Sequence, residues 1–179
     1  MVNMFGNWTI DNFLSLISII LIIVGGFFAL KKWNLELKTK RAEFLEQINL
    51  NIRSDDKLAE ITYLIEYDFS WYNENFHGNK TGLEFSVDRF LAYFDYICYL
   101  KKLGNFTKKE MMIFQYRIIR IFNSPCVRNY LWNIYHFSKK SKTCCSFTNL
   151  INYGIKNRLI DKFEFEDSNN GQYIKYLNF

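Results

Sequence analysis

Histidine and cysteine are the residues of this 179-residue chain best suited to metal binding or nucleophilic chemistry, and they are few. There are two histidines, His77 and His136, and four cysteines without Cys-x-x-Cys spacing, Cys98, Cys126, Cys144 and Cys145. Zinc sites need ligands at paired, closely spaced positions, so we expect no metal site and no bound cofactor. Cys98 and Cys126 stand among apolar residues and are typical of small buried side chains, whereas the adjacent Cys144 and Cys145 are typical of free thiols in a reducing compartment.

Carboxylates gather in one part of the sequence, at Asp55, Asp56, Glu60, Glu66, Asp68 and Glu74. Their spacing fits neither a calcium-binding loop nor the paired carboxylates of an acid–base catalyst. Glu66 and Asp68, on either side of Tyr67, are more typical of a solvated helix face. The sequence also contains no P-loop, nucleophile elbow, G-x-G-x-x-G or H-E-x-x-H motif, and it therefore favours a protein that is not an enzyme.

The segment RNYLWNIYH, residues 128–136, places a guanidinium and an imidazole on one predicted helix. It resembles the Arg-Asn…His motif of HEPN-type ribonucleases, which are all-helical proteins common in bacterial defence and toxin systems. The resemblance implies that Arg128 and His136 act together on the RNA 2′-hydroxyl and phosphate. Seven residues separate them here, more than the family's four to six, and the eight-residue step rotates the two side chains about 80° apart. The other interpretation is structural, with a solvated Arg128 and a half-buried His136 beside aromatic neighbours.

The segment FLSLISIILIIVGGFFAL, residues 13–30, decides where the rest of the chain resides. It carries no charge, and as a helix it would rise about 27 Å, close to the hydrocarbon thickness of a bilayer. Trp8 and Trp33 flank it as interfacial aromatic residues do. A cleaved signal peptide would have basic residues before the apolar run and a small-residue cleavage site after it, and neither is present. A core helix so uniformly apolar would be unusual in so small a domain, so we predict a transmembrane helix over residues 13–33.

Basic residues follow the predicted span and none precedes it; they are Lys31, Lys32, Lys38, Lys40 and Arg41. The positive-inside rule then predicts a single-pass protein of the inner cell membrane, with residues 1–12 outside and the C-terminal part in the cytoplasm. The same five side chains would lie close to anionic lipid headgroups.

Small residues form a stripe on the predicted span. Ser15, Ser18, Gly25, Gly26 and Ala29 fall within about 100° of arc on a helix. Small side chains let helices approach closely in lipid, so the stripe predicts that the span associates with copies of itself. The alternative is that Gly and Ser are simply common in membrane spans.

Beyond the span, helical periodicity and a single proline predict an all-α cytoplasmic part. Residues 34–53 are expected to form a basic amphipathic stalk helix, and residues 54–160 a helical bundle. Within the bundle, Thr107 and Glu110 form a capping box, Pro125 begins another helix, and Ser146 is expected to cap the last one. Residues 161–179 are a tail in which Asn170–Gly171 favours the turn of a small β-hairpin.

Charge is segregated along the predicted bundle. Residues 54–100 contain three Lys or Arg and nine Asp or Glu, whereas residues 101–142 contain ten Lys or Arg and one Glu. The predicted basic surface consists of Lys109, Arg117, Arg120, Lys139, Lys140 and Lys142. It could face the acidic residues of the same or another subunit, or anionic lipid. Nucleic acid has the least support as its partner because no nucleic-acid motif accompanies it.

In its organisation the whole chain resembles bacterial single-pass membrane proteins of unknown function. The segment YLKKLGNFTKKEMMIFQYRII, residues 99–119, is similar to a helix–glycine–capped helix element in them. The resemblance implies a partner or effector of mobile-element or antiphage loci. We therefore expect a membrane-anchored helical interaction protein that contacts lipid and self-associates, possessing a membrane-disturbing activity in a defence or toxin-like system. The alternatives are a tethered HEPN-like ribonuclease and a passive scaffold that recruits a soluble enzyme.

Overall fold

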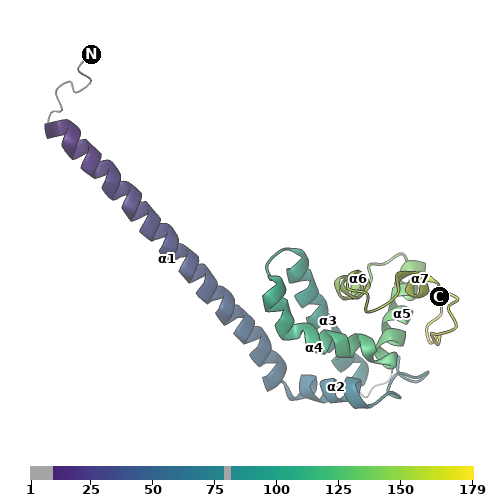
Figure 1. Ribbon diagram of the computed structural model, residues 1–179. Coiled ribbons are helices and arrows are strands. Elements are labelled where there is room, and N and C mark those ends of the chain that lie inside the picture. Colours follow the sequence, from purple (N-terminus) through teal and green to yellow (C-terminus); the bar gives the residue numbers. More distant parts are fainter. Residues whose placement is uncertain (1–9, 79–81) are drawn as a thin grey trace. The chain divides into compact units, whose positions relative to one another are not determined.

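A computed structural model describes residues 10–78 and 82–179, without the side chains of residues 10–12 and 53. All regular secondary structure within these ranges is helical, which confirms the predicted all-α class (Figure 1). The helices are α1 (Ile10–Ser54), α2 (Asp56–Tyr67), α3 (Leu83–Lys102), α4 (Lys108–Asn123), α5 (Pro125–Lys140), α6 (Thr148–Lys156) and α7 (Lys162–Glu166). The chain divides into two compact units, Met1–Leu50 and Asn51–Phe179, and each is described here by itself.

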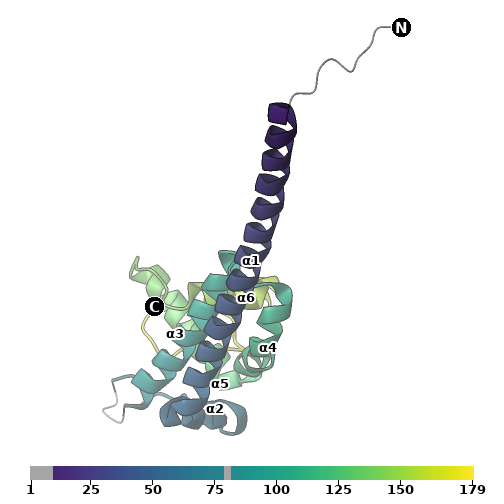
Figure 2. The same ribbon diagram turned by 90° about the vertical axis from the view of Figure 1, so that its left-hand side faces the viewer.

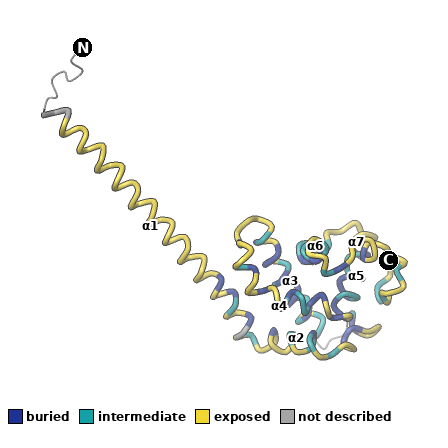
Figure 3. Tube along the Cα trace, viewed as in Figure 1, coloured by how far each residue is buried: buried dark blue, intermediate teal, exposed yellow. Residues whose placement is uncertain are grey.

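The described part of the first unit is a single unbroken helix, the greater part of α1 (Figures 1 and 2). The apolar segment that begins at Phe13 continues without interruption into the basic segment that follows it. Every residue from 13 to 44 is exposed (Figure 3). This helix is long and apolar enough to cross a membrane, and the described chain covers none of its most apolar stretch.

The core of the second unit is formed by apolar residues of α2 to α7. Helix α3 packs against α2 and α6, and α4 packs against α2 and α5. The apolar residues that recur at helical spacing are buried. On α3 these are Val87, Phe90, Leu91, Phe94, Ile97 and Cys98, and on α4 they are Met111, Phe114, Ile118, Ile121 and Phe122. Burying each large apolar side chain contributes about 1.5–3 kcal/mol, so these two stripes account for much of the stability of the unit.

Most helix ends follow the local sequence signals. The predicted capping box of α4 is present, since the Thr107 hydroxyl accepts a hydrogen bond from the Glu110 amide and the Glu110 carboxylate accepts one from the Thr107 amide. Helix α6 differs from the prediction, because Phe147 rather than Ser146 occupies the N-cap position and provides no capping side chain. Asp95 of α3 replaces the cap by accepting a hydrogen bond from the amide of Leu150, at 2.8 Å.

The prediction of a β-hairpin in the tail is wrong. Residues 161–179 contain the short helix α7 and a series of turns, without a strand. A turn does form here, but one position later than predicted: the Tyr173 amide donates to the Asn170 carbonyl at 3.2 Å, which places Gly171 and Gln172 at its centre. The flanking segments do not pair with each other. The segment after the turn bonds instead to side chains of α5, which supply the hydrogen bonds that a partner strand would have supplied.

Candidate functional site

One face of α5 holds the C-terminal tail, and this face includes most of the polar residues of RNYLWNIYH. The residues that contact the tail recur at helical spacing and are Asn129, Trp132, Asn133, His136 and Lys140. The indole of the buried Trp132 donates to the carbonyl of Asp167 at 3.2 Å, and the exposed Lys140 ammonium lies 3.3 Å from Oδ1 of Asn178. The polar residues of this segment are therefore explained by the hydrogen bonds that they form with the tail.

Asn133 is the centre of the contact between α5 and the tail. Its side chain is fully buried, and its Oδ1 accepts hydrogen bonds from the amides of Tyr176 and Leu177 at 2.8 and 3.1 Å. Its Nδ2 donates to the carbonyls of Ile174 and Asn129, both at 2.9 Å. All four hydrogen-bonding positions of the carboxamide are therefore occupied. Oδ1 of Asn129 adds a further bond by accepting from the Ile174 amide.

His136 and Arg128, the two residues of the ribonuclease hypothesis, lie in different surroundings. The His136 side chain is buried, its Nε2 donates to the carbonyl of Phe165 at 3.0 Å, and its ring stacks on Phe179. Burial lowers the pKa of His136, so the imidazole is held neutral. Arg128 is half-buried two turns earlier, where its charge opposes the rise that burial causes in the pKa of Tyr173. This geometry favours the structural interpretation of the segment.

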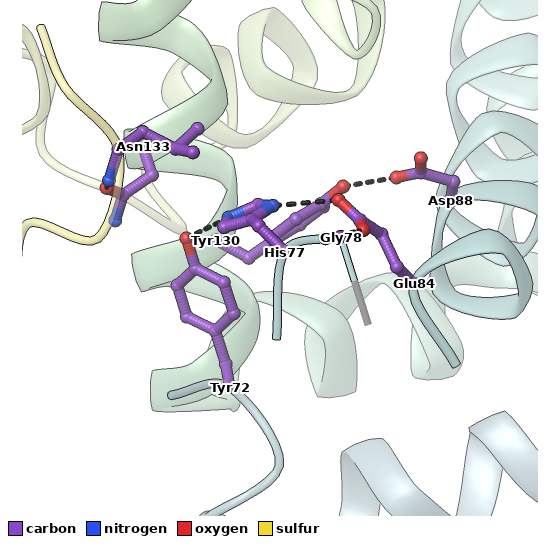
Figure 4. Close-up of polar contacts among 8 residues, drawn as sticks. Tyr72, His77, Gly78, Glu84, Asp88, Tyr130 and Asn133 are labelled. Carbon is purple, nitrogen blue, oxygen red and sulfur yellow. Dashed lines mark hydrogen bonds and ion pairs between the residues drawn. The ribbon is translucent and has the colours of Figure 1, made fainter. Parts of the chain in front are cut away.

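A second polar cluster, which the sequence analysis did not single out, connects the segment after α2 with α3 (Figure 4). Nδ1 of His77 lies 2.7 Å from Oε1 of Glu84, and Nε2 lies 3.0 Å from the Tyr72 hydroxyl. The other Glu84 oxygen accepts a hydrogen bond from the Gly78 amide at 2.9 Å. When the imidazole is neutral, the carboxylate favours the tautomer in which Nδ1 donates to Glu84 and Nε2 accepts from Tyr72.

Next to this cluster, the Tyr130 hydroxyl of α5 donates to the Asp88 carboxylate of α3 (Figure 4). Burial raises the pKa of Tyr130, and the negative charge of Asp88 raises it further. Burial also raises the pKa of Asp88, while the hydrogen bond from Tyr130 opposes that rise. This partly buried hydrogen bond joins α3 and α5 through two residues that are 42 positions apart in the sequence.

Aromatic rings surround the hydrogen bonds of this cluster. The Tyr72 ring meets Tyr130 and Tyr176 edge-on at centroid distances of 5.2 and 4.9 Å, and the His77 ring stacks on Tyr130 at 5.8 Å. A histidine between a carboxylate and a tyrosine could transfer a proton, but here both ring nitrogens already have partners within the protein. In residues 10–78 and 82–179 no three His, Cys, Asp or Glu side chains are grouped to bind a metal. The arrangement is best suited to fixing the two helices and the tail together.

The predicted basic surface is divided among several environments. Arg120 donates to the Glu66 carbonyl at 3.2 Å and lies 3.7 Å from the Glu66 carboxylate, so part of the basic block faces the acidic block of the same chain. The Lys139 ammonium lies over the ring of Tyr135. The remaining members are Lys109 and Lys142, which are exposed, Arg117, which is half-buried, and Lys140, which contacts the tail.

The predicted association stripe and the basic cluster after it lie in the exposed part of α1. Ser15, Ser18, Gly25, Gly26 and Ala29 are exposed, as are Lys31, Lys32, Lys38, Lys40 and Arg41. The Ser18 hydroxyl donates to the carbonyl of Leu14 at 2.9 Å, one turn earlier. A side chain added at Gly25 or Gly26 would meet nothing within 4 Å.

Comparison with protein-family models, with curated proteins and with solved structures finds no match. Sequence reasoning missed Asn133 and the cluster of Tyr72, His77, Glu84 and Asp88. The sequence did contain one signal for Asn133, namely a carboxamide in the middle of an otherwise apolar helix face. Such a side chain is buried only when its hydrogen bonds are satisfied, so it indicates a specific partner elsewhere in the chain.

Proposed function

We propose that this chain is a membrane-anchored interaction protein whose first helix crosses the bilayer and whose second unit lies in the cytoplasm. The observation that carries the proposal is the exposure of the whole apolar stretch of α1. Residues 13–33 rise about 31 Å as a helix, which matches the hydrocarbon thickness of about 30 Å. In water this surface would be a large aggregation-prone patch, whereas lipid solvates it.

The basic residues after the apolar stretch support the orientation. Lys31 and Lys32 follow it directly, and Lys38, Lys40 and Arg41 lie two to three turns further along α1. Residues of this kind are retained on the cytoplasmic side, and each contributes about 1 kcal/mol when it lies near anionic headgroups. The proposed location is therefore the inner cell membrane, with the C-terminal unit inside.

Self-association through the span is the second part of the proposal. The stripe of Ser15, Ser18, Gly25, Gly26 and Ala29 would allow close helix contact, and confinement to a surface raises the effective concentration of every cytoplasmic contact. A protein of this type could act by clustering and disturbing the membrane, as an effector in a defence or toxin-like system. A scaffold that recruits a soluble enzyme would use the same anchor.

The anchor is tested by placing charge at its centre. Thirteen Leu, Ile, Val and Phe residues contribute about 4–8 kcal/mol to insertion, and lysine at the centre costs about 2.5–3.5 kcal/mol per residue. Leu21→Lys together with Ile22→Lys should therefore release the chain from carbonate-washed membranes. Leu35→Lys with Leu37→Lys makes the same chemical change beyond the span and should leave it in the pellet. Recovery of the unaltered chain from the soluble fraction without detergent would disprove the anchor.

Association is tested by crosslinking in membranes. Gly25→Leu with Ala29→Leu should weaken the crosslinked oligomer at least tenfold, since bulky side chains keep the helices apart. The matched control is Val24→Leu, which lies about 150° from the centre of the stripe. If the double variant inserts normally and crosslinks as well as the control, the anchor stands and association through this face is wrong.

A further inference from the structure

A groove of about 810 Å³ lies in the second unit, between the last turns of α3, the first half of α4 and α6. Each helix contributes one face at helical spacing. Helix α3 provides Cys98, Lys101 and Lys102, α4 provides Lys108, Met111, Met112 and Gln115, and α6 provides Asn149, Asn152, Tyr153 and Lys156, with Asn157 directly after it. The volume falls in the range of about 300–1,000 Å³ that is typical of small-molecule sites.

The charge of this groove has one sign. Four of its lining residues are lysines and none is Asp or Glu. Two carboxylates on the same helices have partners within the protein, since Asp95 accepts a hydrogen bond from the Leu150 amide and Glu110 accepts one from the Thr107 amide at 2.6 Å. Lys101 also has a partner within the protein, the carbonyl of Phe106. Lys102, Lys108 and Lys156 are exposed at the groove, and they favour a ligand with several negative charges.

The position of Lys108 strengthens this expectation. It occupies the first turn of α4, where the partial positive charge of the helix end disfavours a cation. Lys102 and Lys156 lie in the last turns of their helices, where a cation is favoured. An anion in the groove would compensate the unfavourable position of Lys108.

The remainder of the lining is suited to a flat heterocycle. Met112, which is exposed, and Tyr153 supply apolar and aromatic surface, and the exposed carboxamides of Gln115 and Asn152 can pair with the edge of a base. The amide of Asn149 is held by the Asp95 carboxylate at 3.0 Å, which fixes its orientation at the groove wall. Aromatic rings and carboxamides are the groups by which proteins bind purines, and lysines bind their phosphates.

We propose that this groove binds a nucleoside polyphosphate, with the phosphates at Lys102, Lys108 and Lys156 and the base against Met112 and Tyr153. The proposal is independent of the membrane anchor, since every lining residue belongs to the second unit. Nucleotide binding would give the cytoplasmic unit a small-molecule input.

The test is equilibrium binding to the full-length chain in detergent micelles, with ATP, GTP, tripolyphosphate and adenosine as separate probes. ATP or GTP should bind more tightly than tripolyphosphate or adenosine alone. Lys108→Gln with Lys156→Gln should weaken nucleotide binding at least tenfold. The control is Lys109→Gln with Lys162→Gln, which removes the same charge at exposed positions outside the groove and should change affinity less than twofold.

A second pair of variants tests the base contacts. Gln115→Ala with Asn152→Ala should weaken ATP binding at least threefold and leave tripolyphosphate binding unchanged. The proposal is overturned if no nucleotide binds, if tripolyphosphate binds as tightly as ATP, or if the two lysine pairs have equal effects. Binding to phosphatidylglycerol vesicles that depends on Lys108 and Lys156, without nucleotide binding, would overturn it in favour of a lipid headgroup.

Discussion

Replacing Asn133 by alanine should release the C-terminal tail from α5. The substitution removes three hydrogen bonds to the tail, with the Ile174 carbonyl and the amides of Tyr176 and Leu177. A hydrogen bond contributes about 0.5–1.5 kcal/mol net, so the loss is about 3 kcal/mol. This value corresponds to an increase of about a hundredfold in the equilibrium constant for tail opening.

Hydrogen–deuterium exchange of the full-length chain in detergent is the direct assay, because it reports local opening at single amides. The amides of Tyr176 and Leu177 should exchange about a hundredfold faster in Asn133→Ala. Asn123→Ala serves as the control, since Asn123 is exposed at the end of α4. Equal exchange of these amides in the unaltered chain and in Asn133→Ala would refute the argument that this side chain binds the tail.

Asn133→Asp separates the donor from the acceptor half of the side chain. A carboxylate can still accept from Tyr176 and Leu177, but it would face the carbonyls of Asn129 and Ile174 with negative charge and no donor. We therefore expect Asp to destabilise the tail at neutral pH as strongly as Ala does. At low pH, where the carboxyl group gains a proton that it can donate, part of the stability should return.

Two further predictions concern stability. Burial lowers the pKa of His136 below its ordinary value of 6.5, so between these two pKa values the unfolded chain binds a proton that the folded chain does not. The free energy of unfolding should therefore decrease as the pH falls through 6.5, and His136→Gln should flatten a profile of melting temperature against pH in that region. Gly154→Ala should lower the free energy of unfolding, measured with denaturant, by about 1–3 kcal/mol, because the added Cβ would lie 2.5 Å from Cζ of Phe122. This cost should outweigh the higher helix propensity of alanine, and Phe122→Leu should reduce it. A stabilising effect of Gly154→Ala would contradict the close packing.

The elements that the sequence predicted well are those specified by nearest neighbours along the chain. The buried faces of α3 and α4 follow from apolar residues three and four positions apart, and the Thr107–Glu110 capping box needs only four consecutive residues. The cap of α6 is different. It depends on Asp95, which lies 55 residues before the amide that it binds, and the spacing around Ser146 contains no information about it.

The tail illustrates how a local turn signal can lead to a wrong element. A turn forms at Asn170–Tyr173, one position later than a hairpin centred on Asn170–Gly171 would need, and an isolated pair of strands is at best marginally stable in water. The half-buried Asn129 and the buried Asn133 offer the same backbone groups side-chain partners on a helix that is already packed. The helix therefore competes successfully with strand pairing.

The polar contacts around Tyr72 could not be predicted because their members meet only after the helices pack. His77 and Glu84 lie on opposite sides of residues 79–81, and Asp88 and Tyr130 are 42 residues apart. Each residue type alone is ordinary on a protein surface. Burying these polar groups stabilises the fold only when every hydrogen-bond partner is present, and the partners come together only in the folded chain.

Tyr176 connects the two sets of contacts, and this connection bears on how the second unit unfolds. Its amide bonds to Asn133, and its ring packs 4.9 Å from the ring of Tyr72, which bonds in turn to His77. Opening the tail would therefore expose an aromatic face of the Tyr72 cluster as well as breaking hydrogen bonds. Because α3 carries Glu84 of this cluster at one end and Lys101 and Lys102 of the groove at the other, the same contacts that hold the tail also fix the helix on which the proposed nucleotide site is built.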